Sequence, residues 1–374
     1  MKAQLYSIML GILLFSIIDN NMQVNLVNEQ NKSVENATNY ISINHPENTC
    51  KNEPKPIVKT EKEIRCDKIK KMDWTSYFRN KYEMTKKFSF INKKHKKKIK
   101  IAIVDTGIDN SNFILMNAVP KDIRQNLKQL DFSGEKTIKD YHGHGSHVAS
   151  IIIGINPKAQ IIPIKYYNKE HSGQESLKAF LSALNKAVDM NVDIINISGG
   201  GEDSSQEELA IIKKAEEKGI IVISAAGNER SNIDKHHNYY FPASYIKNDL
   251  KNIIVVGNQA VSKKDKSPSS NFGYNSVDFF IRGEEVLGFV ADCKIDKMTG
   301  TSQSTPVIAG IISTYMAIYP DSSFEDIRKH LVFNATPDKK GLSKFGFVEV
   351  SKVFNSQFVS ESEVTREIAS IEGK

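Results

Sequence analysis

Three residues of the types used in nucleophilic catalysis lie at the ends of expected strands and helices. Asp105 closes the apolar run IKIAIVD, His144 lies in the stretch DYHGHGSHVAS, and Ser302 precedes a long apolar helix. A serine hydroxyl is a weak nucleophile at neutral pH and needs a base to accept its proton. An imidazole can act as that base when a carboxylate fixes its tautomer and stabilises its charged form. These residue types therefore predict hydrolysis through a covalent serine intermediate.

A fourth polar residue, Asn228, closes the apolar run GIIVISAAGN. A side-chain amide near the amino terminus of a helix can hold the negatively charged oxygen that develops during acyl transfer. Asn228 is therefore the candidate oxyanion donor. Neither GxxxxGK[ST] nor GxGxxG occurs in the chain, so nucleotide chemistry has no support.

The elements that must position these residues alternate between strands and helices. Unbroken β-branched runs predict strands, and spacing at i, i+3 and i+4 predicts helices between them. The expected strands are residues 99–105, 159–167, 192–198, 219–228 and 252–258, and the expected helices are 175–190, 206–219 and 304–320. Such runs are typical of a parallel sheet covered on both faces. We therefore predict an α/β fold with a doubly wound, mostly parallel sheet, whose site lies beyond the carboxyl ends of the strands.

Four sequence blocks in this order resemble those of the subtilisin-like serine proteases. The blocks are IAIVDTGID, GHGSHVAS, ISAAGNE and TGTSQSTPVIAG, and the resemblance covers roughly residues 72–356. It implies a three-layer α/β/α domain. Matched residue by residue, it implies Asp105 as the orienting acid, His144 as general base and acid, Ser302 as the nucleophile and Asn228 as the oxyanion donor.

The resemblance also implies two extended segments that hold the substrate. Ser198, Gly199 and Gly200 resemble the segment that pairs with substrate backbone, and the stretch with Gly173 at its centre (residues 172–174) resembles the opposing segment. A peptide lying between them would add a strand and gain backbone hydrogen bonds. The expected partner is therefore a peptide or protein in extended conformation.

Acidic residues near the expected primary pocket suggest a preference for a basic residue before the scissile bond. Glu229 and Asp234 follow the oxyanion asparagine, and Tyr240 is placed to fill part of the pocket. Carboxylates there would form charge-assisted hydrogen bonds with a basic side chain. Glu175, beside the opposing segment, could add a second such preference. The alternative is that these acids face solvent.

Two departures from the family pattern affect the site. Gln303-Ser304 follow the serine, where the family usually has Met-Ala, so the oxyanion packing could differ. Only residues 151–153 separate SHVAS from GINP, where many relatives carry a longer calcium loop. We expect no required cofactor, and calcium cannot be located from the sequence.

The histidines in H-G-H-G-S-H superficially resemble a metallo-hydrolase cluster of the H-x-H-x-D-H type. Ser146 stands where that cluster needs an aspartate, and no further ligand set is apparent. We therefore predict no metal site, with His147 packed at a helix start and His142 in a loop. Asp109 falls beyond the strand-end acid, and we expect it to serve a local turn.

The ends of the chain differ in composition from its body. Residues 3–18 carry no charge, and residues 1–100 carry the net positive charge while the rest is slightly acidic, giving +7 in all. We predict a signal peptide or N-terminal anchor at residues 1–20, a pro-segment or linker at 21–71, the catalytic domain at 72–356 and a tail at 357–374. The basic run at 93–100 is expected to be a solvated connection; a processing site or a contact with an anionic surface is the alternative.

The three cysteines show no recognisable spacing. Cys50, Cys66 and Cys293 fit neither a disulfide framework nor a zinc site. Cys50 and Cys66 could close a loop in an oxidising compartment. The favoured interpretation is that all three are incidental thiols.

These observations together favour an exported, monomeric serine endopeptidase of bacterial origin, secreted or associated with the cell surface. A pro-segment that inhibits the enzyme and the absence of nucleic-acid partners are part of the expectation. Within the class, the chain looks similar to bacterial lantibiotic leader peptidases, with a general secreted subtilase as the alternative. A catalytically weak binding module with the same fold, and a metallo-hydrolase, are the competing classes.

Overall fold

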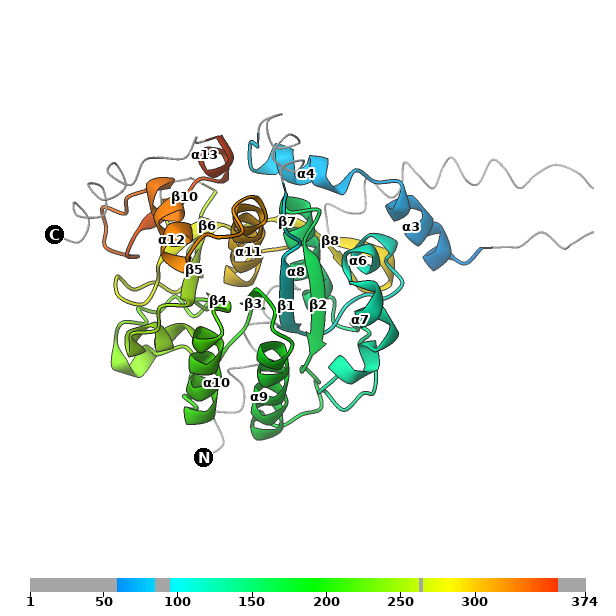
Figure 1. Ribbon diagram of the computed structural model, residues 1–374, viewed down its shortest axis with the longest axis horizontal. Coiled ribbons are helices and arrows are strands. Elements are labelled where there is room, and N and C mark those ends of the chain that lie inside the picture. The colour runs from blue at the N-terminus through cyan, green and yellow to red at the C-terminus, as the bar shows by residue number, and fades with distance from the viewer. Residues whose placement is uncertain (1–58, 85–94, 262–264, 356–374) are drawn as a thin grey trace, which may run out of the picture. The chain divides into compact units, whose positions relative to one another are not determined.

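Buried, β-branched segments form the centre of an eight-stranded sheet in the computed structural model (Figure 1). The structure describes residues 59–84, 95–261 and 265–355, and the residues from Glu61 onward form one compact unit. The strand order is β2-β1-β3-β4-β5-β6-β10-β9. The bounds are β1 Lys100–Asp105, β2 Gln160–Lys165, β3 Ile194–Ile197, β4 Ile221–Ala225, β5 Ile253–Gln259, β6 Phe279–Arg282, β9 Ala335–Thr336 and β10 Gly346–Val348.

All pairings from β2 to β10 are parallel, and only β9 runs antiparallel to its neighbour β10. The register places Asp105 opposite Lys165 at the end of β1 and β2. Because parallel strands end at the same edge, the residues that follow β1, β3 and β4 meet there. The predicted parallel sheet is confirmed, as are the five predicted strands, which are β1 to β5.

Helices cover both faces of the sheet. Helices α8 and α11 pack together on one side, and α9 and α10 pack together on the other (Figure 1). Helices α9 and α10 each bury one apolar face, whereas almost every residue of α8 and α11 is buried. The bounds are α8 His144–Ile155, α9 Gly173–Asp189, α10 Gln206–Glu217 and α11 Thr301–Ile318. The doubly wound α/β/α architecture predicted from the sequence is therefore present.

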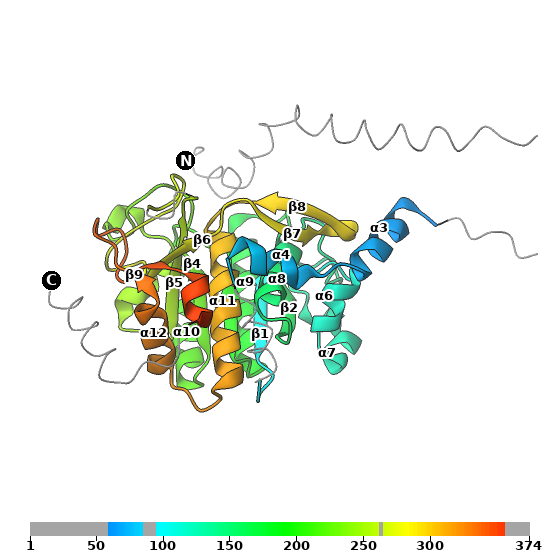
Figure 2. The same ribbon diagram turned by 90° about the horizontal axis from the view of Figure 1, so that it is seen from above.

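Smaller elements fill the periphery. Strands β7 (Val286–Val290) and β8 (Lys294–Met298) form an antiparallel hairpin that lies beside α4 and α8 (Figure 2). This hairpin leads into α11 and was not predicted. The remaining α-helices are α3 Glu61–Lys70, α4 Trp74–Lys81, α6 Phe113–Ala118, α7 Lys121–Gln125, α12 Phe324–Phe333 and α13 Val350–Asn355, and the 3₁₀ helices are η3 Leu127–Leu130, η4 His236–Asn238, η5 Ala243–Asn248 and η6 Ala291–Cys293.

Helix α4 is part of the core. Phe78 is fully buried against α8, where a Cβ at Gly154 would collide with its ring. The Trp74 ring stacks on Phe289 with centroids 4.0 Å apart, and its Nε1 donates to the Ser150 carbonyl at 2.8 Å. Burying aromatic rings of this size contributes about 2 kcal/mol each. The N-terminal helices therefore fold with the sheet.

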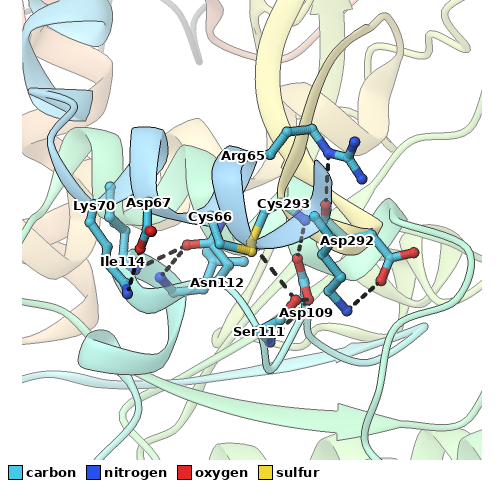
Figure 3. Close-up of a disulfide and its surroundings, with 12 residues drawn as sticks. Arg65, Cys66, Asp67, Lys70, Asp109, Ser111, Asn112, Ile114, Asp292 and Cys293 are labelled. Carbon is cyan, nitrogen blue, oxygen red and sulfur yellow. Dashed lines mark hydrogen bonds and ion pairs between the residues drawn. A yellow bond between two sulfur atoms is a disulfide. The ribbon is translucent and has the colours of Figure 1, made fainter. Parts of the chain in front are cut away.

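Helix α3 is tied to the same unit by a disulfide between Cys66 and Cys293 (Figure 3). The expectation of incidental thiols is wrong for these two residues; Cys50 lies outside the described residues. They are 227 residues apart, so spacing could not reveal a pairing that arises only when α3 docks beside η6. Lys62 strengthens this contact by pairing with Asp292 at 2.7 Å.

The compact unit begins at Glu61, within the stretch expected to be a pro-segment or linker. The expected catalytic-domain boundary at residue 72 falls between α3 and α4, both of which contact the body. Residues 61–71 therefore belong to the folded unit, because their buried side chains and the disulfide attach them to it. The proposed signal peptide or anchor lies outside the described residues. In the part that the structure describes, no helix is long and apolar enough to cross a membrane.

Candidate active site

Asp105 and His144 come together at the carboxyl edge of the sheet. Asp105 ends β1 and is 5% exposed, while His144 is the first residue of α8. His144 Nδ1 lies 2.8 Å from Oδ1 and 3.0 Å from Oδ2 of Asp105. A carboxylate accepts hydrogen bonds only, so Nδ1 carries the proton and donates it. This leaves Nε2 as the basic atom of the ring.

Two glycines allow α8 to begin this close to Asp105. Gly143 is the N-cap residue with φ of 94°, a left-handed conformation that glycine adopts without steric cost. A Cβ at Gly145 would collide with the carbonyl oxygen of Gly107 and lie 3.3 Å from the Asp105 Cβ. The backbone approach that brings His144 to Asp105 therefore requires glycine at both positions.

Asp140 organises the start of α8 from within the protein. It is fully buried, and its Oδ1 accepts hydrogen bonds from Thr106 Oγ1 and from the N–H groups of His142 and Gly143. Its Oδ2 accepts from the N–H and Oγ of Ser146. Donors at a helix amino terminus stabilise a carboxylate, and the carboxylate in turn fixes the helix end. Asp140 therefore orients the turn that carries His144.

The same turn is linked to the disulfide. Ser146 Oγ accepts a hydrogen bond from the Asp109 N–H at 2.8 Å. Asp109 is fully buried; its Oδ1 accepts from the N–H of Ser111, and its Oδ2 accepts from the Cys293 N–H at 2.7 Å (Figure 3). Asp109 thus has the expected local turn contact. In addition, it joins the α8 start to the disulfide.

The pKa of His144 reflects two opposing influences. Burial by itself lowers the pKa of the imidazole, and the adjacent carboxylate of Asp105 outweighs that effect. Asp140 adds to the rise, so the pKa lies above its ordinary value. The ring of His142 lies 6.2 Å from that of His144 between centroids, and partial burial together with this neighbouring imidazole lowers the pKa of His142. The site therefore favours the charged form of His144 that follows proton uptake.

Ser302 lies in the first turn of α11, and its backbone is held by Ser198. Pro306 has no N–H, so the helix cannot satisfy the carbonyl of Ser302 four residues earlier. Ser198 Oγ donates to that carbonyl at 3.0 Å, and Ser302 Oγ donates to the Ser198 carbonyl at 2.7 Å. No hydrogen bond joins Ser302 Oγ to His144 within the described residues. Catalytic hydrogen bonds often form only when substrate is bound.

Asn228 lies beside the same helix start. Its Oδ1 accepts hydrogen bonds from the N–H and Oγ1 of Thr301 at 3.0 and 3.2 Å. This orientation leaves Asn228 Nδ2 as a donor. The Ser302 N–H has no acceptor among the residues that the structure describes. Two donors and the positive end of the α11 dipole are therefore available at this helix start.

A comparison with known protein families agrees with this arrangement. A model described as the subtilase family matches residues 96–348. The chain belongs to the subtilase family of serine proteases. This subtilase is 32% identical over 238 residues to the major intracellular serine protease of Bacillus subtilis (strain 168), covering 61% of this chain and 71% of that protein.

Solved structures share the subtilase fold. A lanthipeptide protease matches with a TM-score of 0.57 and 21% identity, over 68% of this chain and 86% of that one. The epidermin leader peptide processing serine protease of Staphylococcus aureus, in its S393A form, matches with a TM-score of 0.59 and 20% identity, over 70% and 77%. Both likenesses concern the fold. The substrate of the subtilase is a peptide, as its family implies.

The two expected substrate segments differ in the structure. Residues 198–200 directly follow β3, and Gly201 pairs with Phe241 as an antiparallel bridge. Gly173, in contrast, begins α9, with Ser172 as N-cap and Glu175 completing a capping box. The expectation of extended backbone is therefore wrong from Gly173 onward, because the S-x-x-E pattern satisfies the first helical N–H groups.

The expected pocket acids have different surroundings. The Glu229 carboxylate accepts a hydrogen bond from Asn271 Nδ2 at 2.6 Å, and its partial burial there raises the pKa of the carboxyl. Asp234 accepts from Ser276 Oγ at 2.7 Å and from the Asn275 N–H. Asp234 is thus engaged with the loop at residues 275–276, while Glu229 directly follows Asn228.

The Tyr240 ring lies between Gly200 and Gly227. A Cβ at Gly200 would lie 2.6 Å from its ring, and one at Gly227 would lie 3.1 Å from it. The Phe241–Pro242 peptide bond that follows is cis. Because neither Gly200 nor Gly227 has a side chain, the Tyr240 ring fits between them.

The remaining histidines do not gather into a ligand set. His147 is fully buried and its Nε2 donates to the Val286 carbonyl at 2.9 Å; burial lowers its pKa to about 4. His142 is exposed. In the described part of the chain, no group of three or more His, Cys, Asp and Glu residues could hold a metal ion.

Several residues of the site were not singled out from the sequence. Asp140 was missed, although its position before the histidine block marks a helix start. The role of Pro306 could have been inferred, since proline within a helix frees the carbonyl four residues earlier. Gln303, flagged as a departure, is buried and its Nε2 contacts the Met298 sulfur at 3.8 Å.

Proposed function

We propose that this subtilase is an endopeptidase in which Ser302 is the nucleophile and His144 the base. The observation that carries the proposal is the Asp105–His144 pair, which leaves Nε2 as the base at the edge of the sheet where the amino terminus of α11 meets Ser198 after β3. Ser302 and Asn228 lie at that terminus. The arrangement supports acyl transfer, because base, nucleophile and oxyanion donors share one edge of the sheet.

The first half of the reaction forms an ester. Ser302 Oγ exchanges its hydrogen bond with Ser198 for one with His144 Nε2, attacks the scissile carbonyl carbon and passes its proton to Nε2. The charged imidazole is stabilised by Asp105, and Asn228 Nδ2 with the Ser302 N–H holds the oxyanion. Collapse breaks the C–N bond, and His144 returns the proton to the leaving amine.

The second half hydrolyses that ester. A water molecule gives its proton to His144 Nε2 and attacks the acyl carbon. The same donors hold the second oxyanion. When the C–O bond to Ser302 breaks, the proton returns to Oγ and the peptide acid leaves.

A serine-directed fluorophosphonate tests this assignment. The full chain should be labelled at Ser302, and Ser302→Ala should lose both labelling and peptide cleavage. Ser182→Ala, on the exposed face of α9, is the matched control and should keep both. Labelling of Ser302→Ala at the wild-type rate would refute the proposal. Absence of labelling in the folded wild type would favour the binding-module alternative.

For the substrate, we propose a precursor peptide with a basic residue before the scissile bond. Glu229 supports this, because Asn271 Nδ2 and the backbone N–H groups of Asn228 and Glu229 hold its carboxylate beside Asn228, where negative charge favours a cationic side chain. Gly173 and Glu175 lie in the first turn of α9, at the expected opposing rim. The fold likeness to leader peptide processing proteases supports removal of a leader peptide, as from a lantibiotic precursor.

Peptides that end in Arg, Phe or Leu before the scissile bond separate these possibilities. We expect Arg to be preferred, and Glu229→Gln to reduce that preference about tenfold while leaving the Leu peptide unchanged. Glu217→Gln, at the exposed end of α10, is the control. Equal or faster cleavage of the Phe peptide by the wild type would contradict the basic preference.

We also propose that the enzyme is exported and that any leader or pro-segment ends before Glu61. The disulfide between Cys66 and Cys293 supports an oxidising compartment, where such bonds persist. Helices α3 and α4 support the boundary, because both pack on the folded unit. Mass spectrometry of the N-terminus in the culture medium tests this; a mature chain starting after Cys66 would contradict it.

A further inference from the structure

An open cavity of about 800 Å³ lies at the end of the sheet opposite the candidate active site. It is lined by residues that precede β1 and β2 and by the start of α7. Strand β1 runs from Lys100, next to the cavity, to Asp105 in the candidate active site. At the usual rise of a strand, its length separates the cavity from Asp105 by about 17 Å. The cavity is therefore distinct from the peptide-cleaving site.

Among the described residues that line the cavity, every ionisable side chain is a base and none is a carboxylate. These bases are His95, Lys96, Lys97, Lys98, Lys121, Arg124 and Lys158. Lys97 is paired with Asp193 at 2.6 Å. None of the other lysines nor Arg124 has an ion pair in the part of the chain that the structure describes. The concentration of unpaired positive charge favours an anionic ligand.

Two of these side chains carry buried nitrogens without a partner. Arg124 Nε and both ring nitrogens of His95 are inaccessible and have no hydrogen-bond partner among the described residues. Burial and the nearby Lys158 lower the pKa of His95 to about 4, so the ring is neutral and can both donate and accept. Buried polar atoms normally have partners, because leaving one unpaired costs about 1–3 kcal/mol.

The backbone that carries the bases is held in place. The N–H groups of Lys96 and Lys97 both donate to the Ala317 carbonyl near the end of α11. The Lys158 N–H donates to Asn156 Oδ1, and Asn156 Nδ2 donates to Ser313 Oγ on α11. Basic groups on a fixed backbone lose less entropy on binding than a solvated run would. The described part of the run at 93–100 is thus anchored.

We propose that this cavity binds a phosphate-class oxyanion, either as free phosphate or as the headgroup of an anionic lipid. Arg124 supplies a planar donor and Lys121 and Lys158 supply positive charge, the combination that suits phosphate oxygens. Apolar residues including Trp74, Ile114 and Val119 line the remainder of the cavity and can contact the organic part of a phosphodiester. This site is independent of the chemistry proposed for Ser302.

Binding is tested with the full-length chain carrying Ser302→Ala, which prevents self-cleavage. Calorimetric titration with inorganic phosphate is compared with sodium chloride at equal ionic strength. Co-sedimentation is measured with vesicles of phosphatidylcholine alone and with added phosphatidylglycerol. Saturable phosphate binding without vesicle preference supports free phosphate as the ligand, and preference for phosphatidylglycerol supports the lipid headgroup.

Variants locate the binding in the cavity. Arg124→Gln with Lys158→Gln should weaken the observed binding at least tenfold, and Arg124→Lys should restore part of it. Lys213→Gln with Lys339→Gln removes the same charge from exposed positions elsewhere and should leave binding unchanged. The proposal is overturned if neither probe binds above its control, or if both double variants bind alike. Unchanged circular dichroism confirms that each variant is folded.

Discussion

Replacing Asp140 with asparagine tests how the structure positions His144. The amide can keep the three hydrogen bonds that Oδ1 accepts, but its NH₂ group then faces the N–H and Oγ of Ser146. Hydrogen bonds to a charged group contribute about 1.5–3 kcal/mol each, and Ser146 Oγ can rotate to accept. We therefore expect Asp140→Asn to lower the free energy of unfolding by about 3 kcal/mol.

The same substitution should change catalysis in two ways. Loss of the bonds to Ser146 loosens the first turn of α8, and a misplacement of His144 by 1 Å would lower kcat/KM about 100-fold. Asp140 also raises the pKa of His144. Since the base must be neutral to accept the serine proton, removing that charge lowers the pKa, and the acid limb of the kcat/KM profile moves to lower pH.

Hydrolysis of a fluorogenic peptide between pH 4 and 9, together with urea unfolding, measures both effects. Asp131→Asn is the matched control, because Asp131 accepts hydrogen bonds from Ser133 and Thr137 in the preceding loop and does not touch α8. It should leave the acid limb in place. If Asp140→Asn lost stability but kept the wild-type acid limb and kcat/KM, Asp140 would be purely structural, and the positioning argument would fail.

Three further predictions concern the disulfide, Asn228 and the buried Glu208. Removing the disulfide by Cys66→Ser with Cys293→Ser should lower the free energy of unfolding by about 3–5 kcal/mol, since the bond closes a loop of 227 residues; urea unfolding measures it, and reductant should have no effect on this variant. Asn228→Ala should lower kcat about 100- to 1000-fold with little change in KM, as loss of one oxyanion donor does; a change confined to KM would contradict that role. Glu208 is buried, which raises the pKa of its carboxyl from 4.5 to about 7. Below pH 4.5 the Glu208 carboxyl is protonated in both the folded and the unfolded state. As the pH rises to 7, this carboxyl ionises only in the unfolded state, so its contribution to the free energy of unfolding falls over this range. Glu208→Gln should therefore be more stable than wild type by about 3 kcal/mol at pH 8 and by much less at pH 5; equal pH dependence of unfolding in both proteins would count against it.

Much of the central architecture could be predicted because its signals are local. Apolar β-branched runs and helical spacing depend on neighbouring residues, and they identified strands β1 to β5. Parallel pairing then places the ends of those strands at one edge. This is why Asp105, which ends β1, lies at the helix start that carries His144, and Asn228, which follows β4, lies at the helix start that carries Ser302.

The wrong expectation of extended backbone at Gly173 overlooked a helix-start pattern that the sequence does contain. Ser172 and Glu175 stand three residues apart and form a capping box, so α9 begins at Gly173. Family resemblance suggested extended backbone there. The local hydrogen-bonding pattern was the better guide, because the first N–H groups of a helix need acceptors.

The sequence by itself determined the order along the chain of the main strands and helices, and the residue types available for chemistry. Only the tertiary structure decided that Cys66 bonds to Cys293, that Trp74 and Phe78 cover α8, and that Asp140 holds the turn before His144. These contacts join segments that are distant along the chain or that turn sharply between elements. No local pattern encodes them, because each exists only after separate helices and strands have packed around the same core.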